Sequence, residues 1–432
     1  MTDTELRRAV SGRVLLPGEP EFEQAARPWN LAVTQRVAAV VEAADAADVA
    51  ALVRYARQAG LTITAQPSGH GATGDTDGVI LLRTGRLDEL TVHPDERWAR
   101  VGAGVMWGRV QAEAGAHGLT GLAGSTPAVS VVGYLLGGGL SWFSRRYGWA
   151  SGSVRAFEIV DADGRQARVS AASDAELFWA LRGGGGDYAV VTAVEIDLYP
   201  APSVYGGRIM WQGDRTREVF EAFRDLTDQA PPELSLWVNR LQIPQAPPMV
   251  ALDATYLGDP DDGAALLDRL GKIDGVIADK RGVIAVADLG DITAEPVDPS
   301  PAASRVELLT GLDDQAIDTL LDEPMDPLLN VQLRHLGGAL ADPSEGAAGA
   351  VAEPYLLYMF GLGIPAVAAA VAARQAALTA RLGAAVSGRK PYTFLAPGET
   401  AAQAVTEESL ARLRELKRAR DPQAVFRANF PV

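Results

Sequence analysis

Residues 114–144 contain no Asp, Glu, Lys or Arg, and eight of these 31 residues are glycine. Glycine in a helix interior costs about 1 kcal/mol relative to alanine, so a membrane-spanning helix is not expected here. The stretch must instead fold as short elements and close turns. Its many backbone N–H groups, with no carboxylate among them, predict a surface that binds a pyrophosphate through amide dipoles. A glycine-rich region that only packs tightly is the alternative.

The composition of the 432-residue chain excludes several classes of protein. Its length indicates two or three domains. A net charge of −16 repels phosphate backbones and argues against nucleic acid as a partner. The absence of cysteine removes disulfides, thiolate nucleophiles and cysteine-ligated metals, and only four histidines remain. No metal site is expected, and any redox chemistry must come from an organic cofactor.

No targeting or membrane segment is expected from the sequence. Charges interrupt the N-terminal residues, so no signal peptide is expected. The uncharged segment 355–373 is broken by Gly361, Gly363 and Pro365. We therefore expect a cytoplasmic protein with no membrane contact.

The first 200 residues show alternating strand and helix patterns. A βαβ-like unit begins at Arg36, and its second strand, 61–65, leads into a loop at 66–74 that contains three glycines. The glycines allow the backbone of this loop to approach a ligand closely. Further elements are expected as strands at 79–83, 87–92, 99–101, 155–160, 166–169 and 188–198, and as helices at 106–117 and 175–182.

Pro200 and Pro202 indicate a domain boundary. Beyond them an α+β pattern follows. Its expected strands are 207–211, 234–241, 249–256 and 355–361, and its expected helices are 216–229, 261–270 and 366–382. An amphipathic helix at 408–422 and an extended tail complete the chain.

Two local motifs are candidates for cofactor chemistry. Gly102-Ala103-Gly104 is followed by its next glycine one position too late for the dinucleotide fingerprint, which disfavours a Rossmann site. His70 stands between Gly69 and Gly71 directly after a buried strand, so its imidazole is uncrowded. A hydrogen-bonded structural histidine is the alternative.

Five sequence blocks occur together and in one order. They are GHGATGDTDGVILLRTGRLDEL, VGAGVMWGRV, HGLTGLAGSTPAVSVVGYLLGGGLSWFSRRYG, ELFWALRGGGGDYAVVT and RDPQAVFRANFPV. Together they resemble FAD-linked oxidases of the vanillyl-alcohol oxidase / p-cresol methylhydroxylase (PCMH) superfamily, in the berberine bridge enzyme-like branch with its bacterial members.

The resemblance implies an α+β fold. It predicts a split FAD-binding domain of the PCMH type, with two α+β subdomains, made of residues 1–200 and a C-terminal return at 389–432. Residues 201–388 would form an α+β substrate domain with an antiparallel sheet. In this domain VQLRHLGGAL resembles a strand of bacterial members.

The resemblance also implies how FAD is held. His70 would bond covalently to the 8α-methyl group of the flavin. Thr126 stands where some members carry a second flavin-bonding cysteine, so only one bond is possible. Val129 matches the valine of members that react readily with dioxygen, whereas Asp187 and Ala189 depart from an N-F-G pattern usual after the glycine run. The expected cofactor-binding residues are Gln66, Pro67, Ser68, Gly69, His70, Gly71, Gly124, Ser125, Thr126, Val129, Gly133, Tyr134, Gly137, Gly138, Gly139, Val191 and Asn429.

Two residues are candidates for catalysis. Tyr392-Thr393-Phe394 resembles the family's Y-x-N-[FY] element without its asparagine, so Tyr392 could act as a base or orient the substrate. A buried tyrosine under the tail is the alternative. His335 could face the substrate, or it could be structural.

We therefore expect an FAD-dependent oxidoreductase that takes a hydride from an alcohol, amine or activated C–H of a small organic molecule, such as a secondary metabolite or sugar. Dioxygen would be the acceptor, and the protein would be a monomer or homodimer. A dehydrogenase with another acceptor is one alternative. A cyclase or isomerase that retains FAD without redox turnover is the other.

Overall fold

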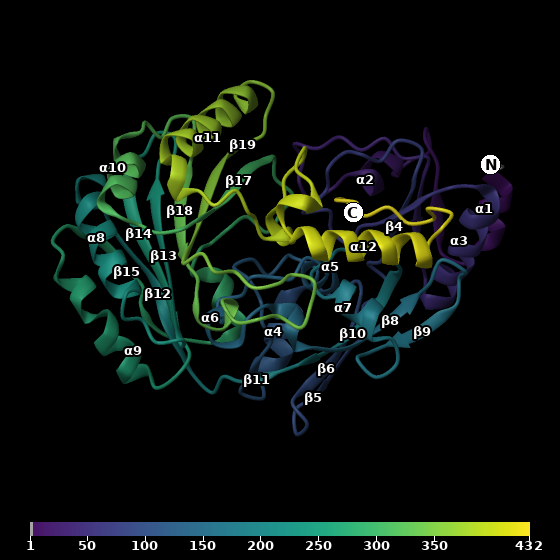
Figure 1. Ribbon diagram of the computed structural model, residues 1–432, viewed down its shortest axis with the longest axis horizontal. Coiled ribbons are helices and arrows are strands. Elements are labelled where there is room, and N and C mark those ends of the chain that lie inside the picture. The colour runs from purple at the N-terminus through teal and green to yellow at the C-terminus, as the bar shows by residue number, and fades with distance from the viewer. Residues whose placement is uncertain (1–2) are drawn as a thin grey trace.

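Four β-sheets organise residues 3–432, the part of the chain that the computed structural model describes (Figure 1). The first sheet has the order β1-β2-β4-β3, and its last three strands are parallel. Its strands are β1 (Arg13–Leu15), β2 (Ala39–Glu42), β3 (Ile63–Ala65) and β4 (Ile80–Arg83), and the helices beside it are α1 (Asp3–Ala9), α2 (Phe22–Ala26) and α3 (Ala46–Ala59).

Helix α3 begins and ends as its sequence predicts. Asp45 caps its first turn by accepting from the Asp48 backbone N–H at 2.8 Å. Gly60 ends the helix in the left-handed conformation, with φ +64°. The helix thereby delivers the chain into β3 and the loop that follows.

Asp48 supplies a pH-dependent part of the stability. Its buried carboxylate accepts from the backbone N–H groups of Ser11 (2.7 Å), Gly12 (2.6 Å) and Ala44 (2.9 Å). Burial by itself raises the pKa of Asp48, but these hydrogen bonds outweigh burial and hold the pKa below its usual value. A carboxyl of lowered pKa stabilises the fold above its unfolded pKa, and this stabilisation is lost as the pH falls through the folded pKa.

Asp48→Asn is therefore expected to lower the free energy of unfolding by about 1–3 kcal/mol near neutral pH, because an amide cannot accept all three hydrogen bonds. Near pH 3 the loss should be smaller, since an aspartate in the unfolded chain is then largely protonated and the lowered pKa of folded Asp48 stabilises the wild type less. Urea unfolding at both pH values checks this. Equal losses at the two pH values would contradict it.

The second sheet is antiparallel, in the order β5-β6-β10-β8-β9. Its strands are β5 (Leu90–His93), β6 (Trp98–Gly102), β8 (Val154–Val160), β9 (Gln166–Val169) and β10 (Val190–Asp197). The pair β7 (Leu119–Thr120) and β11 (Tyr199–Pro200) lies apart from it. Helices α4 (Trp107–Gly115), α5 (Val131–Leu136), α6 (Ser144–Tyr147) and α7 (Ala175–Leu181) accompany these strands.

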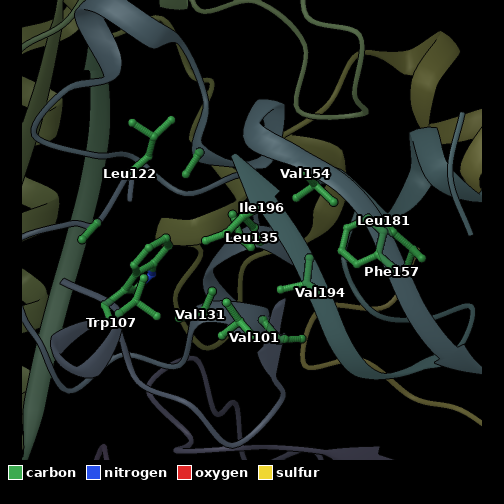
Figure 2. Packing of buried hydrophobic residues seen from close by; sticks show 14 of the residues in the cluster. Val101, Trp107, Leu122, Val131, Leu135, Val154, Phe157, Leu181, Val194 and Ile196 are labelled. Carbon is green, nitrogen blue, oxygen red and sulfur yellow. The ribbon is translucent and has the colours of Figure 1, made fainter. Parts of the chain in front are cut away.

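The uncharged stretch folds as β7, α5, the start of α6 and the turns between them, as its glycines predict. Apolar side chains from α5 pack against Trp107 of α4 and against β10, as Figure 2 shows. Ser130 caps α5 through a hydrogen bond to the Gly133 N–H. The stretch is thereby fixed on a rigid core.

The largest sheet is antiparallel, in the order β15-β12-β14-β13-β18-β19-β17, with β16 also paired to β12. Its strands are β12 (Val204–Gln212), β13 (Leu234–Leu241), β14 (Met249–Tyr256), β15 (Val276–Asp279), β16 (Gly282–Ile284), β17 (Ala302–Leu309), β18 (Asn330–His335) and β19 (Tyr355–Leu362). Its helices are α8 (Thr216–Thr227), α9 (Pro260–Leu267), α10 (Asp314–Asp322) and α11 (Ala368–Leu382).

The two faces of this sheet differ in polarity. Apolar side chains of β12, β13, β14, β18 and β19 pack against the four helices in one core. In Figure 1 these helices lie on the outer side of the sheet, away from the N-terminal elements. The opposite face carries Arg208, Asn239, Asp253 and Gln332. Because strand residues alternate between faces, the polar side chains point away from the helices.

Helix α12 (Glu407–Arg420) returns the chain to the N-terminal elements and packs against α7 (Figure 1). The tail then joins β3, where the Ile63 N–H donates to Val425 O at 2.7 Å and the Arg427 N–H donates to Ile63 O at 2.9 Å. Short 3₁₀ turns occur at η1 (Ala150–Ser153), η2 (Gly213–Arg215), η3 (Asp268–Lys272), η4 (Val286–Asp291), η5 (Gly338–Leu340), η6 (Gly383–Ala385), η7 (Tyr392–Phe394) and η8 (Ala401–Gln403). Among residues 3–432, each helix is too short or too polar to cross a bilayer.

Candidate active site

A cavity of about 480 Å³ lies where the N-terminal loops, the polar face of the largest sheet and the C-terminal tail meet. The loop after β3, the uncharged stretch, and residues of β17, β18 and β19 all contribute to its wall. The 3₁₀ turn η7 and residues 426–430 complete the lining.

The loop after β3 is held open toward the cavity. The Arg83 guanidinium donates to the backbone oxygens of Ala25, Arg27 and Gln66, which fixes the start of this loop. Gly69 adopts φ +84°, and a Cβ there would lie 2.9 Å from Pro28. Only glycine fits this position, so the loop passes close to Pro28 and presents the next side chain, His70, to the cavity.

His70 has the properties of a neutral ligand or nucleophile. Its ring stacks on Trp29, with centroids 4.1 Å apart, and its Nδ1 lies 2.8 Å from the Ser68 hydroxyl. Its Nε2 is buried and has no hydrogen-bond partner among the described residues. Burial lowers the pKa of His70 to about 4, so the imidazole is uncharged at neutral pH.

Gln66 and Asn429 connect this loop to the tail. The Gln66 Nε2 donates to Gln35 Oε1 at 2.7 Å and to Asn429 Oδ1 at 3.0 Å. Its Oε1 is buried and has no partner among the described residues. Both side chains line the cavity, so the tail forms part of its wall.

Most of the expected cofactor residues of the uncharged stretch also line the cavity. These are Gly124, Ser125, Thr126, Val129, Gly133, Tyr134 and Gly137. The Tyr134 hydroxyl is buried without a partner in the described chain, and burial raises its pKa well above the usual range. Pro67, Ser68, Gly69, Gly71 and Val191 contribute from the other side.

Two glycines of this stretch do not reach the cavity, which corrects the expectation for Gly138 and Gly139. A Cβ at Gly138 would meet Ala348 and Trp149, and one at Gly139 would meet the ring of Tyr134. Both have positive φ, of +95° and +74°. They are needed for close packing behind the wall.

Asp187, which departs from the family pattern, holds the tail. Its buried carboxylate accepts from the Ala428 N–H at 2.8 Å and from the Val432 N–H at 3.0 Å. Its neighbours Gly185 and Gly186 line the cavity, but Asp187 itself does not. This aspartate therefore positions one wall of the cavity from behind.

Tyr392 lines the cavity, but its environment is not that of a base. Its hydroxyl donates to Phe430 O at 2.7 Å. Burial, together with the charge of Asp187, raises its pKa well above the usual range. The observed contacts match the alternative of a buried tyrosine that packs under the tail.

His335 does not face the cavity, and that prediction is wrong. Its Nε2 lies 2.8 Å from Arg145 Nη1, and its ring approaches Tyr355 on the helix-covered face. Burial and the nearby Arg145 charge lower the pKa of His335 to about 3. Strand alternation explains the error, because the preceding residue, Arg334, is the one that points to the cavity.

Sequence reasoning missed the cavity wall supplied by the largest sheet. This wall contains Ser304, Asn330, Gln332, Arg334, Tyr358 and Phe360, together with Glu295 from the segment before β17. The signal that could have identified it is the polar alternation Asn-x-Gln-x-Arg along β18. In this strand Val331 and Leu333 point into the helical core.

Polar atoms without partners gather in this cavity. Besides those of Gln66, His70 and Tyr134, Trp107 Nε1 and Asn330 Oδ1 are buried and unpaired among the described residues. All five side chains line the cavity. A buried polar group without a hydrogen bond costs about 1–3 kcal/mol, so this concentration indicates a site built for a ligand.

Comparison with known proteins identifies the N-terminal part of the chain. Residues 37–170 match the FAD binding domain family. The chain is 29% identical to (R)-6-hydroxynicotine oxidase of Paenarthrobacter nicotinovorans over 296 residues, which are 66% of this chain and 64% of that protein. The matched region thus spans less than two thirds of this curated relative.

Solved structures match the fold over its whole length. The crystal structure of 6-hydroxy-D-nicotine oxidase from Arthrobacter nicotinovorans superposes with a TM-score of 0.88 at 24% identity, covering 100% of both chains. The berberine bridge enzyme-like 1 protein of Physcomitrella patens gives a TM-score of 0.88 at 20% identity, covering 100% of this chain and 99% of that one. The chain therefore has the mixed α+β fold of these solved structures, and its residues 37–170 match the FAD binding domain family.

Proposed function

We propose that this chain is an FAD-dependent oxidase of the berberine bridge enzyme-like branch that oxidises a small organic molecule with dioxygen as acceptor. The observation that carries the proposal is the cavity, in which four of the five buried polar atoms without partners in the described chain belong to residues within 37–170, the region that matches the FAD binding domain family, and the fifth belongs to Asn330 of β18. The polar face of a second domain covers them. We assign residues 1–200 and 389–432 to the cofactor domain and 201–388 to the substrate domain, and we propose a cytoplasmic location.

The residues present fit FAD. Gln66 Oε1 and Tyr134 Oη are polar atoms that still need partners, and His70 Nε2 is free to form a bond. A Cβ at Gly133 would meet nothing closer than 3.9 Å, so the backbone is open to a ligand there. The uncharged stretch offers backbone N–H groups to a pyrophosphate without repelling it.

Bound FAD supplies an acceptor for the hydride of the substrate and, after reduction, an electron donor for dioxygen. The chain's own part is to hold the reactants and to exclude water. The neutral imidazole of His70 is the group we expect to bond the flavin, because burial keeps it uncharged. Asn429 and the tail, fixed by Asp187 and Tyr392, close one wall over the same space.

His70→Ala is expected to abolish covalent attachment of the flavin while the protein still folds. Only the bond is removed, since the cavity and the glycine-rich wall remain. The measurement is flavin fluorescence of the denatured protein on an SDS gel, which should be bright for the wild type and dark for the variant. The exposed His117 provides a matched control, and His117→Ala should stay bright. A bright His70→Ala band would contradict the assignment.

Reactivity toward dioxygen tests the oxidase part without knowledge of the substrate. The flavin of the purified protein is reduced chemically without air and then mixed with air-saturated buffer. Reoxidation within seconds supports an oxidase. Reoxidation over many minutes would indicate a dehydrogenase with another acceptor.

A further inference from the structure

Arg334 is a buried cation that forms no ion pair within the described part of the chain, although the charges of Glu295 and Asp253 act on it at a distance. Its side chain is only 5% exposed and lines the cavity. No carboxylate forms an ion pair with it among the described residues, whereas the buried Lys390 is paired with both Glu307 and Glu399. Burying a charge in this way is costly unless a partner compensates it.

Arg334 also differs from Arg145, another buried arginine. The guanidinium of Arg145 donates to backbone oxygens of Leu234, Leu336 and Ala230. Arg334 makes a single hydrogen bond, from Nε to Gln332 Oε1 at 2.6 Å. Its two terminal nitrogens therefore have no acceptor in the described chain.

A chain of buried hydrogen bonds fixes the orientation of this guanidinium. The Gln332 Nε2 donates to Asn239 Oδ1 at 2.7 Å, and the Asn239 Nδ2 donates to Asp253 Oδ2 at 2.9 Å. Arg208 binds both carboxylate oxygens of Asp253, at 2.6 and 2.8 Å. Because the Gln332 amide is oriented in this way, its oxygen must face Nε of Arg334.

Aromatic rings lie within cation–π distance of the same guanidinium. It lies 3.8 Å from the ring centroid of Trp237, which itself stacks on Trp142 at 3.6 Å. Phe394 and Tyr358 lie at 5.4 and 5.5 Å. Cation–π contacts thus stabilise the guanidinium of Arg334 in its position. Its two terminal nitrogens remain available as hydrogen-bond donors.

A planar fork with two free N–H donors matches the geometry of a carboxylate, which it can bind through two parallel hydrogen bonds. The surrounding wall contains Tyr358, Phe360 and Phe394, which suit a planar apolar body. Glu295 lines the same cavity and its charge acts on Arg334 at a distance, without an ion pair, so each negative charge added to the cavity is also repelled. The site therefore favours a ligand with one carboxylate.

We propose that Arg334 binds a carboxylate of the substrate, so that the substrate class is a small planar monocarboxylic acid. That the bound acid is a substrate rests on the proposed function. The carboxylate site itself follows from the contacts of Arg334 and can be tested separately.

Isothermal titration of the purified protein with benzoate and with its neutral analogue benzamide tests the proposal. The wild type should bind benzoate at least about tenfold more tightly than benzamide, as expected for a charge-assisted bidentate contact. Arg334→Gln should remove this preference. Arg334→Lys should keep only part of it, because an ammonium lacks the fork.

Arg217→Gln is the matched control, since Arg217 lies on α8, pairs with Asp318 and carries the same charge. This variant should keep the wild-type preference. A wild type without preference for benzoate, or an Arg334→Gln variant that retains it, would overturn the proposal. The wild-type comparison stands even if Arg334→Gln does not fold.

The two proposals fail in distinguishable ways. The heat of benzoate binding does not require the flavin, whereas the visible spectrum of the same sample reports it. A colourless protein that prefers benzoate supports the carboxylate site and contradicts the oxidase. A yellow protein without that preference supports the oxidase and contradicts the carboxylate site.

Discussion

Lys417→Met is expected to lower the free energy of unfolding by about 3–5 kcal/mol, because it leaves two buried carboxylates without a cation. The ammonium of Lys417 lies 2.8 Å from Asp421 and 3.8 Å from Asp187. It also donates to the backbone oxygens of Asp187 and Phe426, both at 2.7 Å. Both carboxylates are almost fully buried and hold backbone N–H groups of the tail. Urea unfolding measures the loss.

The same variant should loosen the tail over the cavity. Faster removal of the C-terminal residues by carboxypeptidase checks this second effect. Lys272→Met is the matched control, since Lys272 also pairs with an aspartate four residues away, at 2.7 Å, but in an exposed setting. Lys272→Met should lower the free energy of unfolding by less than about 1 kcal/mol. Equal losses in the two variants would contradict the role of Lys417.

Asp253→Ala is expected to lower the free energy of unfolding by about 3–5 kcal/mol, since it leaves the guanidinium of Arg208 unpaired in a largely buried position. Asp253 is fully buried and accepts hydrogen bonds from both Arg208 and Asn239. Burial by itself lowers the pKa of Arg208, but the hydrogen bonds and charge of Asp253 raise it above the usual value. Thermal or urea unfolding provides the measurement.

Asp318→Ala provides the comparison, because the Asp318 carboxylate pairs with Arg217 at 2.8 Å and both of these side chains are about half exposed. It should cost less than about 1 kcal/mol. Adding Arg208→Met to Asp253→Ala should recover part of the loss, since the unpaired charge is then removed. No recovery in the double variant would contradict the ion-pair explanation.

Regular elements with a strong period were predictable. The alternating segments 234–241 and 249–256 form strands with the predicted limits, β13 and β14. The helix expected at 366–382 begins two residues later, as α11. In these segments, the apolar positions of the periodic pattern are buried in the structure.

Strands with charged residues on one face were missed. In β17 the sequence AASRVELL contains Arg305 and Glu307, which pair with each other at 2.7 Å. The alternation Arg305-Val306-Glu307-Leu308 is visible but short, because Ala302, Ala303 and Ser304 before it do not alternate. The polar strand β18 was anticipated only through its resemblance to the family, and its faces were assigned incorrectly.

The candidate site was predictable where its residues come from one short segment of the sequence. The loop at Gln66–Gly71 and eleven of the 31 residues of the uncharged stretch line the cavity, and each of these two groups comes from one short segment of the sequence. The wall that includes Arg334 depends on the register of β18 between β13 and β19. The alternation along β18 indicates which of its residues share a face, but which strands lie beside it is decided by pairing with segments distant in the sequence.

The visible absorbance spectrum of the purified protein, recorded before and after acid precipitation, tests the central claim most directly. A flavin spectrum whose yellow colour stays with the precipitated protein is the result we predict. It would place FAD on this chain and show a covalent bond in one measurement. A colourless protein would contradict the proposed function, and a yellow protein whose colour passes into the supernatant would contradict the bond to His70.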